Sequence, residues 1–325
     1  MASIKFNETY IKDFYTLIGP LECNGKLKKF DAKMNDYYFG EKTFEQAEAK
    51  MQKVVLDGII KSTDLFYKDI SLIIGGDLLN QLSATSYALE DYKVPFLGVY
   101  AACATFPESI IIGAMFLKDK SMNNILTVTS SHNLSAEKQF RNPIEYGCPK
   151  PHTATHTATA AISTCLTKEK SKLKVESATI GKVVNMGITD ANMMGAVMAP
   201  AAADTLITHL NDLKRNANYY DLILTGDLGC VGQNILKEYL KINNGLELNN
   251  LKDSGCELYC DMQDTYSGGS GPVCLPLILF NKILNSKKYK KILIIGTGSL
   301  HNVTSINQHS EIPAIAHAVS LEVVE

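Results

Sequence analysis

The chain repeats itself, and the repeat limits the folds that it can adopt. Residues 72–78 recur as residues 222–228, at an offset of 150 positions, and a second register at an offset of 167 places Cys103 opposite Ser270. Two sequence matches that occur in the same order in both parts of the chain indicate a duplicated unit rather than chance. A protein built from two copies of one βα unit usually binds its ligand where the copies meet. We therefore expect two similar halves with a site at their junction.

The pattern of apolar residues predicts a βαβαβ unit in each half. In the first half, strands are expected at 70–74, 94–100 and 124–129, and helices at 43–61, 79–92 and 103–117. The second half repeats the order with a helix at 198–213, a strand at 220–225, helices at 231–240 and 274–284, and a strand at 291–295. Residues 1–40 are expected to form a strand and a loop, and alternation predicts further strands at 158–166 and 174–184.

Continuous apolar strands favour a parallel sheet that is covered by helices on both faces, in an α/β fold. We place the boundary between the halves at residue 173. The predicted N-terminal half is 1–173, and the predicted C-terminal half is 174–325.

Composition and charge exclude several classes of protein. The chain of 325 residues is 46% apolar and carries 32 basic and 34 acidic residues in mixed order, for a net charge of −2. This balance provides neither the basic face that nucleic acid requires nor a polybasic membrane patch. The N-terminus lacks an export signal, and no apolar run approaches the roughly 20 residues of a spanning helix. We expect a protein kept inside the cell, with its 8 scattered cysteines as free thiols.

Cys103 follows a predicted strand and precedes a predicted helix. At such a position the helix dipole and free N–H groups favour the thiolate that a nucleophile needs, and the alternative is an inert buried cysteine. Asp77 and Asp227 occupy two further strand-to-helix junctions. Aspartate is a common helix cap there, and it can line a pocket at the same time. Beside a thiol, an aspartate raises the thiol pKa rather than activating the cysteine.

Two histidines follow predicted strands, at the strand ends where open α/β sheets bind ligands. His132 follows the strand at 124–129, and His301 holds the matching place in the second half. Arg141 comes shortly after His132 and is a candidate to meet an anion. His317 is expected in the closing strand, as a core residue.

Neither a metal nor a cofactor is expected. His152 and His156 lack the intervening Glu of a zinc-binding helix, and Cys256 with Cys260 is a lone pair. The glycine-rich segment 268–271 lacks the Lys of a phosphate-binding loop and is better suited to close approach of the backbone.

The duplicated halves, with a cysteine at the start of the first central helix, resemble the thiolase fold that thiolases and ketoacyl synthases share. This resemblance implies five layers in the order α-β-α-β-α. In ketoacyl synthases a histidine follows the second-half strand and an asparagine precedes the second central helix. Gly226 fills the histidine position here, and the asparagine position falls at Gly268 and Gly269. The resemblance therefore implies a site that keeps its cysteine, lacks proton-transfer partners and is not catalytic.

Longer strings resemble the stage V sporulation protein AD family of spore-forming Firmicutes. They run from about residue 70 to the end and include Gly76–Gln81, Ala102–Thr105, Ser130–Asn133, Gln139–Arg141, Gly187–Asp190, Met198–Thr205 and Asp221–Leu228. The resemblance implies a non-enzymatic component of the SpoVA channel, peripherally attached to the cytoplasmic face of the forespore and spore inner membrane. It implies dipicolinic acid as the ligand, possibly with calcium, taken up during sporulation and released at germination. The implied partners are other SpoVA channel proteins and a second copy in a homodimer.

The predicted ligand site is the cleft between the halves, lined by Asp77, Cys103, His132, Arg141 and Asp227. Dipicolinate is a flat aromatic dianion, and it would meet N–H donors at a helix N-terminus in such a cleft. Two alternatives remain open. One is an acyltransferase of the thiolase or ketoacyl-synthase type that uses Cys103, and the other is a docking subunit that binds no small molecule.

Overall fold

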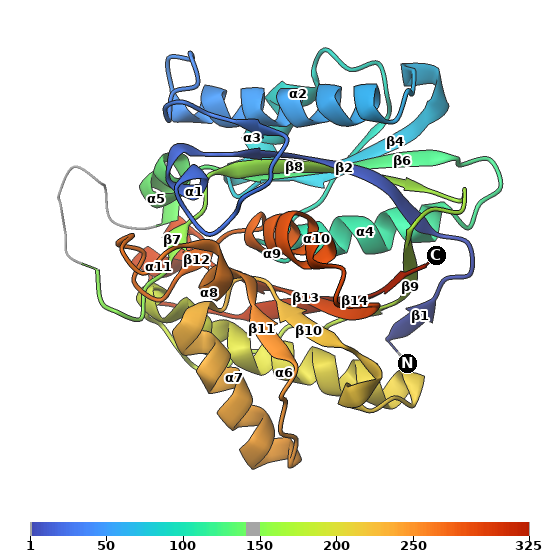
Figure 1. Cartoon of the computed structure of the whole chain (residues 1–325). Coiled ribbons are helices and arrows are strands. Elements are labelled where there is room, and N and C mark those ends of the chain that lie inside the picture. The colour runs from blue at the N-terminus through green and yellow to red at the C-terminus, as the bar shows by residue number, and fades with distance from the viewer. Residues whose placement is uncertain (1, 141–149, 325) are drawn as a thin grey trace.

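Five layers of helices and strands make up the fold in the computed structural model, which describes residues 2–140 and 150–324. Figure 1 shows them stacked as helices, sheet, helices, sheet and helices, with α2 (Phe44–Ser62) on one outer side and α6 (Met194–Leu213) on the other. The thiolase-like α/β fold with duplicated halves, predicted from the sequence, is therefore confirmed.

The elements have the following bounds. The strands are β1 (Ser3–Lys5), β2 (Tyr10–Ile18), β3 (Ala32–Lys33), β4 (Ile70–Gly76), β5 (Phe96–Gly98), β6 (Asn124–Ser131), β7 (His156–Thr157), β8 (Ala160–Thr167), β9 (Leu173–Ile180), β10 (Leu222–Thr225), β11 (Leu251–Asp253), β12 (Gly269–Ser270), β13 (Lys291–Ser299) and β14 (Ala314–Val323). The other helices are α1 (Pro20–Cys23), α3 (Ser83–Leu89), α4 (Thr105–Phe116), α5 (Asn133–Phe140), α7 (Gly229–Asn244), α8 (Ser254–Leu258), α9 (Cys274–Ile278), α10 (Leu284–Ser286) and α11 (Val303–Asn307).

The two halves repeat one strand order. In the first half the strands lie in the order β5-β4-β6-β8-β2, and in the second half in the order β11-β10-β13-β14-β9. Antiparallel pairing of β2 with β9 joins both halves into a single sheet. The division of the chain at residue 173 stays a prediction, because this sheet runs through both halves.

The sheet is mixed, which corrects the expectation of a parallel sheet. In the first half β4 is parallel to β5 and β6, but β8 is antiparallel to both β6 and β2. The second half has the same pattern, with β14 antiparallel to β13 and β9. Parallel neighbours need a crossover connection, whereas antiparallel neighbours can be joined by a chain that turns back on itself. Residues 1–40, expected to give a strand and a loop, contribute β2 near the centre of the sheet.

Local sequence explains the outer helix α2. The Thr43 side chain accepts a hydrogen bond from the Gln46 N–H at 3.2 Å and caps the helix start. Ala47, Met51, Val55 and Ile59 follow at four-residue spacing, and all four are buried against the sheet.

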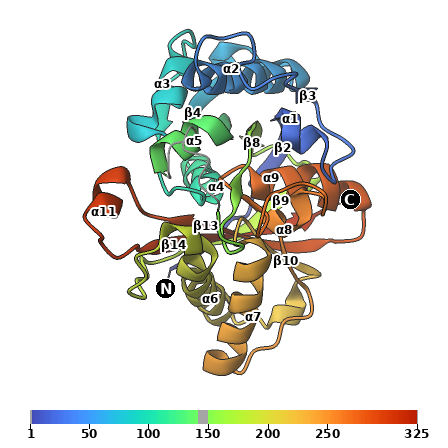
Figure 2. The same cartoon turned by 90° about the vertical axis from the view of Figure 1, so that its left-hand side faces the viewer.

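The central layer lies between the two halves of the sheet and forms the largest apolar core. Figure 2 shows α4 and α9 enclosed between the strands of the two halves. Phe106 and Ile110 of α4 belong to the same buried cluster as Leu277 of α9. Packing on both sides explains why the apolar residues of α4 are spread around the helix rather than gathered on one face. This layer fixes the start of α4, where Cys103 lies, against the second half.

The expectation that all cysteines are free thiols was wrong. Cys230, in the first turn of α7, and Cys256 of α8 form a disulfide. Cys23, Cys103, Cys165, Cys260 and Cys274 are free. Because Cys230 and Cys256 lie 26 positions apart in sequence, only the packing of α8 beside the start of α7 brings them together.

In the part of the chain that the structure describes, no helix has the length and apolar character needed to cross a membrane.

Candidate functional site

Cys103 lies in a tight turn between β5 and α4. Ala102 has a positive φ of 49°, a conformation that residues with a side chain rarely adopt. The Thr105 hydroxyl holds this turn, since it donates to the Ala102 carbonyl at 2.7 Å and accepts from the Ala101 N–H at 3.1 Å. Such strain persists where the surrounding structure fixes the backbone, and it is common at functional sites. The turn presents the half-buried thiol of Cys103 just before the start of α4.

Asp227 is the carboxylate that faces this thiol. It follows β10 and is fully buried. The Thr297 hydroxyl donates to it at 2.7 Å, and the Gly271 N–H donates at 3.4 Å. The Cys103 thiol lies beside this carboxylate. Burial raises the pKa of Asp227 to about 7, although these donors act in the opposite direction.

The environment of Cys103 keeps its thiol protonated. Burial and the neighbouring Asp227 raise the pKa of Cys103 well above its usual value, and the Gly271 N–H opposes them only weakly. This agrees with the expectation from sequence that an aspartate beside a thiol does not activate it. A neutral thiol is a poor nucleophile.

Alkylation of Cys103 is therefore expected to be slow at pH 7.5 and to become at least tenfold faster in an Asp227→Asn variant. The amide removes the negative charge and donates a hydrogen bond to the sulfur, so the thiolate forms at lower pH. Iodoacetamide labelling, followed by mass spectrometry of the Cys103 peptide, measures the rate. Asp261→Asn is the control, because that side chain is fully exposed. An unchanged rate in Asp227→Asn would show that another group controls the thiol.

Two cavities open beside this turn. The inner chamber is lined by residues that include Cys103, Ser270, Gly271 and Ser299. The outer chamber has a volume of about 470 Å3, and its lining includes Asn80, Gln81, Leu300 and Asn302. Tyr100 and His301 line both chambers. The site lies between β5 of the first half and the end of β13 of the second, as the repeat predicts.

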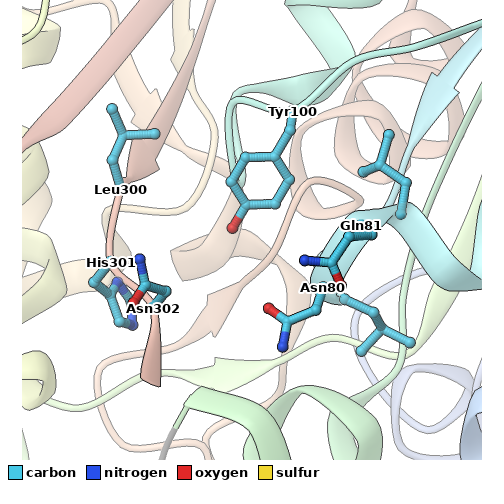
Figure 3. Close-up of a pocket in the computed structure, with 8 residues that line it drawn as sticks. Asn80, Gln81, Tyr100, Leu300, His301 and Asn302 are labelled. Atoms are coloured by element: carbon cyan, nitrogen blue, oxygen red, sulfur yellow. The ribbon is translucent and has the colours of Figure 1, made fainter. Parts of the chain in front are cut away.

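Side chains converge on the outer chamber from both halves. Figure 3 shows the Tyr100 hydroxyl and the amide groups of Asn80, Gln81 and Asn302 turned toward the space between them. His301 lies beside Asn302, and its ring nitrogen Nδ1 is 2.9 Å from the Ser299 hydroxyl. The chamber lining thus offers amide, phenol and imidazole groups that can take part in hydrogen bonds.

Asp77 does not line either chamber. Its buried carboxylate accepts hydrogen bonds from the Leu79 N–H and from the N–H and hydroxyl of Thr85, at 2.6 to 2.8 Å. It therefore holds residues 79–85, which include part of the outer chamber wall, but it is not the N-cap that the sequence analysis expected, because the N-cap position of α3 is Leu82. Burial raises the pKa of Asp77.

His132 is also placed away from both chambers. Its Nε2 donates to the Tyr37 carbonyl at 2.8 Å, and its Nδ1 accepts from the Leu134 N–H at 3.2 Å. The ring packs against Phe44 and Tyr37. Burial lowers the pKa of His132 to about 4, so the ring is neutral at physiological pH. Arg141 lies outside the described residues.

The equivalence of Gly226 with the ketoacyl-synthase histidine stays a prediction, and the structure shows only where Gly226 and its neighbour Asp227 face. A side chain at Gly226 would point into the core, toward Gly296 and Leu275, whereas Asp227 points to Cys103. Both residues lie in the turn that follows β10. Likewise Ser270 and Gly271, rather than Gly269, line the inner chamber.

Sequence reasoning missed most of the outer chamber. It named His301 as a strand-end histidine but gave no role to Asn80, Gln81, Tyr100 or Asn302. The available signal was their position, because each follows an apolar strand at the carboxyl edge of the sheet. Amide residues in loops are otherwise ordinary, so composition alone does not distinguish them.

Comparison with known proteins shows a family that matches nearly the whole chain. The family model described as stage V sporulation protein AD matches residues 2–322. The stage V sporulation protein AD of Bacillus subtilis (strain 168) is 37% identical over 317 residues, which cover 96% of this chain and 94% of that protein.

Solved structures with the same fold are condensing enzymes of low sequence identity. The 3-oxoacyl-[acyl-carrier-protein] synthase III of Aquifex aeolicus VF5 matches with a TM-score of 0.58 and 15% identity, over 97% of this chain and 99% of that one. A variant of OleA from Xanthomonas campestris matches with a TM-score of 0.62 and 13% identity, over 98% of each chain. At such identities the likeness concerns the fold alone.

Proposed function

The chain belongs to the stage V sporulation protein AD family, a family of sporulation proteins, and on that basis we propose that it binds dipicolinic acid. In this proposal it is a non-enzymatic component of the SpoVA channel of the spore inner membrane. It acts in dipicolinate uptake during sporulation and in release at germination.

The observation that carries the proposal is the pair of chambers where the two halves meet. Open α/β sheets bind ligands at the carboxyl ends of their strands, and the outer chamber volume of about 470 Å3 lies within the range of small-molecule sites. Dipicolinate presents two carboxylates and a ring nitrogen in one plane. The amides, the phenol and the imidazole of the outer chamber supply hydrogen-bond donors for those acceptors.

Charge bears on the form of the ligand. Among the described residues, neither chamber is lined by a lysine or arginine, and the buried Asp227 lies near Cys103. A free dianion would be repelled by an ionised Asp227, whereas a calcium chelate carries no net charge. Arg141, which the sequence analysis proposed as the anion contact, lies outside the described residues. The binding experiment therefore compares dipicolinic acid with and without calcium.

Calorimetric titration is expected to show dipicolinic acid binding with a stoichiometry of one per chain. Isophthalic acid has the same carboxylate spacing but no ring nitrogen, and we expect it to bind at least tenfold more weakly. Titrations with calcium absent and present establish whether the free acid or the chelate is the ligand. Absence of heat with dipicolinic acid in both conditions would contradict the proposal.

We further propose peripheral attachment to the cytoplasmic face of the forespore and spore inner membrane, through other SpoVA channel proteins, and assembly as a homodimer. Co-purification of the tagged chain with SpoVA membrane proteins, and light scattering of the isolated chain, test these two points.

Acyl transfer by Cys103 is the second candidate. It is favoured by the condensing-enzyme fold and by the position of His301, which lines the same inner chamber as Cys103. It is opposed by Asp227, because a protonated thiol attacks a thioester slowly. Incubation with acyl-CoA thioesters and intact-mass measurement tests this reading, for which a mass gain lost in Cys103→Ala would be required. A chain that neither binds dipicolinate nor becomes acylated would be a docking subunit.

A further inference from the structure

The disulfide between Cys230 and Cys256 lies at the surface of the second half. Cys230 is exposed in the first turn of α7, and Cys256 of α8 is half-buried. Figures 1 and 2 both show α8 beside the start of α7. Exposed disulfides are more easily reduced than protected structural ones, and they are often regulatory or catalytic. The exposed sulfur of Cys230 makes this bond accessible to a thiol in solution.

Contacts other than the disulfide also hold the two helices together. The buried carboxylate of Asp253 caps α8, since it accepts a hydrogen bond from the Cys256 N–H at 3.1 Å. The same carboxylate accepts hydrogen bonds from the N–H groups of Leu228 and Gly229 at the start of α7, both at 3.0 Å. One side chain thus binds the backbone beside each cysteine. The two sulfurs are therefore expected to stay close to each other after the bond between them is broken.

Further contacts fix the backbone around the pair. The Cys230 N–H donates to the Ser267 carbonyl at 2.6 Å, and the Gly255 N–H donates to the Gly226 carbonyl at 3.1 Å. Gly255 also packs against the backbone of Gly269 so closely that there is no room for a Cβ. None of these contacts involves a sulfur atom. The reduced protein is therefore expected to keep its fold, with both thiols in position to form the bond again.

We propose that Cys230 and Cys256 form a reversible redox site, which a low-molecular-weight thiol opens and the corresponding small disulfide closes in the folded protein. Opening releases α8 from its covalent tie to α7 and leaves the hydrogen-bonded contacts in place. The redox site goes beyond the proposed function, because neither cysteine lines a chamber and no bound dipicolinate is required.

The exchange proceeds through the exposed sulfur. A thiolate of the small thiol attacks Cys230 Sγ and forms a mixed disulfide there, and Cys256 leaves as a thiolate that takes a proton from water. A second small thiolate attacks the small-molecule sulfur of the mixed disulfide, which yields the small disulfide and the Cys230 thiol. Two small thiols are oxidised while the protein disulfide gains two electrons. Closing follows the same steps in reverse, and proximity of the two thiols favours its last step.

Glutathione serves as the probe of opening and closing. The folded protein is incubated first with reduced and then with oxidised glutathione, and samples from each stage are labelled with iodoacetamide. Mass spectrometry of the Cys230 and Cys256 peptides is expected to show two free thiols after the first stage and a disulfide after the second. Circular dichroism verifies that the protein stays folded. A bond that opens only in urea, or thiols that oxidised glutathione does not join again, would overturn the proposal.

Single substitutions test the route of exchange. In Cys256→Ser, oxidised glutathione is expected to leave a stable mixed disulfide on Cys230, which is measured as a gain in mass. In Cys230→Ser, the same modification of the half-buried Cys256 is expected to be at least about tenfold slower, because access to the sulfur limits the reaction. Equal rates in the two variants would overturn Cys230 as the point of attack.

Cys260→Ser is the matched control for these variants. Cys260 is a free, half-buried thiol in the same part of the chain as Cys256, so its loss should leave the opening and closing of the disulfide unchanged. Thermal unfolding verifies that each variant is folded. In the wild-type protein, the mixed disulfide is expected to be short-lived, because Cys256 displaces the small thiol. A mixed disulfide that accumulates on wild-type Cys230 would overturn the proposal that the two sulfurs are held together.

Discussion

Replacement of Gly298 by alanine is expected to destabilise the protein by at least about 3 kcal/mol, the upper end of the cost of overpacking a core. Gly298 lies near the end of β13 and is buried. A Cβ there would lie well inside van der Waals contact with the Ala101 carbonyl oxygen, and it would crowd the Ala104 nitrogen as well. Both atoms belong to the backbone of the turn that carries Cys103, so neither can move aside as a flexible side chain could.

The matched control for Gly298→Ala is Gly226→Ala. Gly226 is also a buried glycine at the end of a strand, but a Cβ there would have its nearest neighbours at 3.6 to 3.7 Å, which is ordinary van der Waals contact. Gly226→Ala is therefore expected to change stability by less than about 1 kcal/mol. Urea unfolding followed by circular dichroism measures both variants. Similar midpoints for the two would contradict the close contact between β13 and the Cys103 turn.

The free energy of unfolding is expected to fall as pH rises from 6.5 to 8.5. Burial raises the pKa of Asp227 and of Glu22 to about 7 and that of Glu48 to about 8. These carboxyls ionise at lower pH in the unfolded chain, so the folded state binds more protons and loses stability as pH rises through their folded pKa values. Buried His132, His209 and His317, with pKa values lowered to about 4, have the opposite effect, but only up to about pH 6.5.

Asp227→Asn isolates the part of this pH dependence that comes from the candidate site. A shift of three pKa units corresponds to roughly 4 kcal/mol as an upper limit, at about 1.4 kcal/mol per unit. We expect the stability of the variant relative to the wild type to be greater at pH 8.5 than at pH 5 by at least about 1 kcal/mol, because the loss in the wild type grows as pH rises from the unfolded to the folded pKa of Asp227. Urea unfolding at pH 5, 6.5, 7.5 and 8.5 measures this difference. Asp261→Asn, at an exposed position, should leave the profile unchanged. A gain that is the same at every pH would contradict the role of ionisation.

The architecture could be predicted because it depends on patterns that the sequence itself carries. The repeats at offsets of 150 and 167 correspond to β4 with β10 and to β6 with β13, and each pair occupies the same place in its half of the sheet. The helix at 43–61 corresponds to α2 (Phe44–Ser62). Helical and strand periodicities are local properties, so they can be read without knowing what each element packs against.

The direction of the strands could not be predicted in the same way. Strand β8 is as continuously apolar and small as the parallel strands, and it nevertheless runs antiparallel to β6 and β2. Burial on both faces gives the same residue pattern in either orientation. The orientation of a strand instead depends on the path of the chain that connects it to its neighbour. The connection from β6 to β8 includes residues outside the described part of the chain.

The candidate site was predicted in part. Cys103 and Asp227 come together as expected of two junctions that meet, and their contact accounts for the raised pKa of the thiol. Asp77 and His132 satisfy the same sequence rules, yet their side chains form hydrogen bonds inside the first half. A residue at the end of a strand can point into the cleft or back into its own half, and its type does not reveal which.

The sequence by itself determined the duplicated thiolase-like fold, the family and the position of the cysteine at a strand-to-helix junction, because these depend on residue order and local periodicity. The tertiary structure alone decided that Asp227 faces the thiol, that Cys230 and Cys256 are joined, and that Tyr100 and His301 line both chambers. Each of these features depends on how close two residues lie in space although they are far apart in the sequence. Such distances are set by the packing of the two halves around the central helices, which no local pattern encodes.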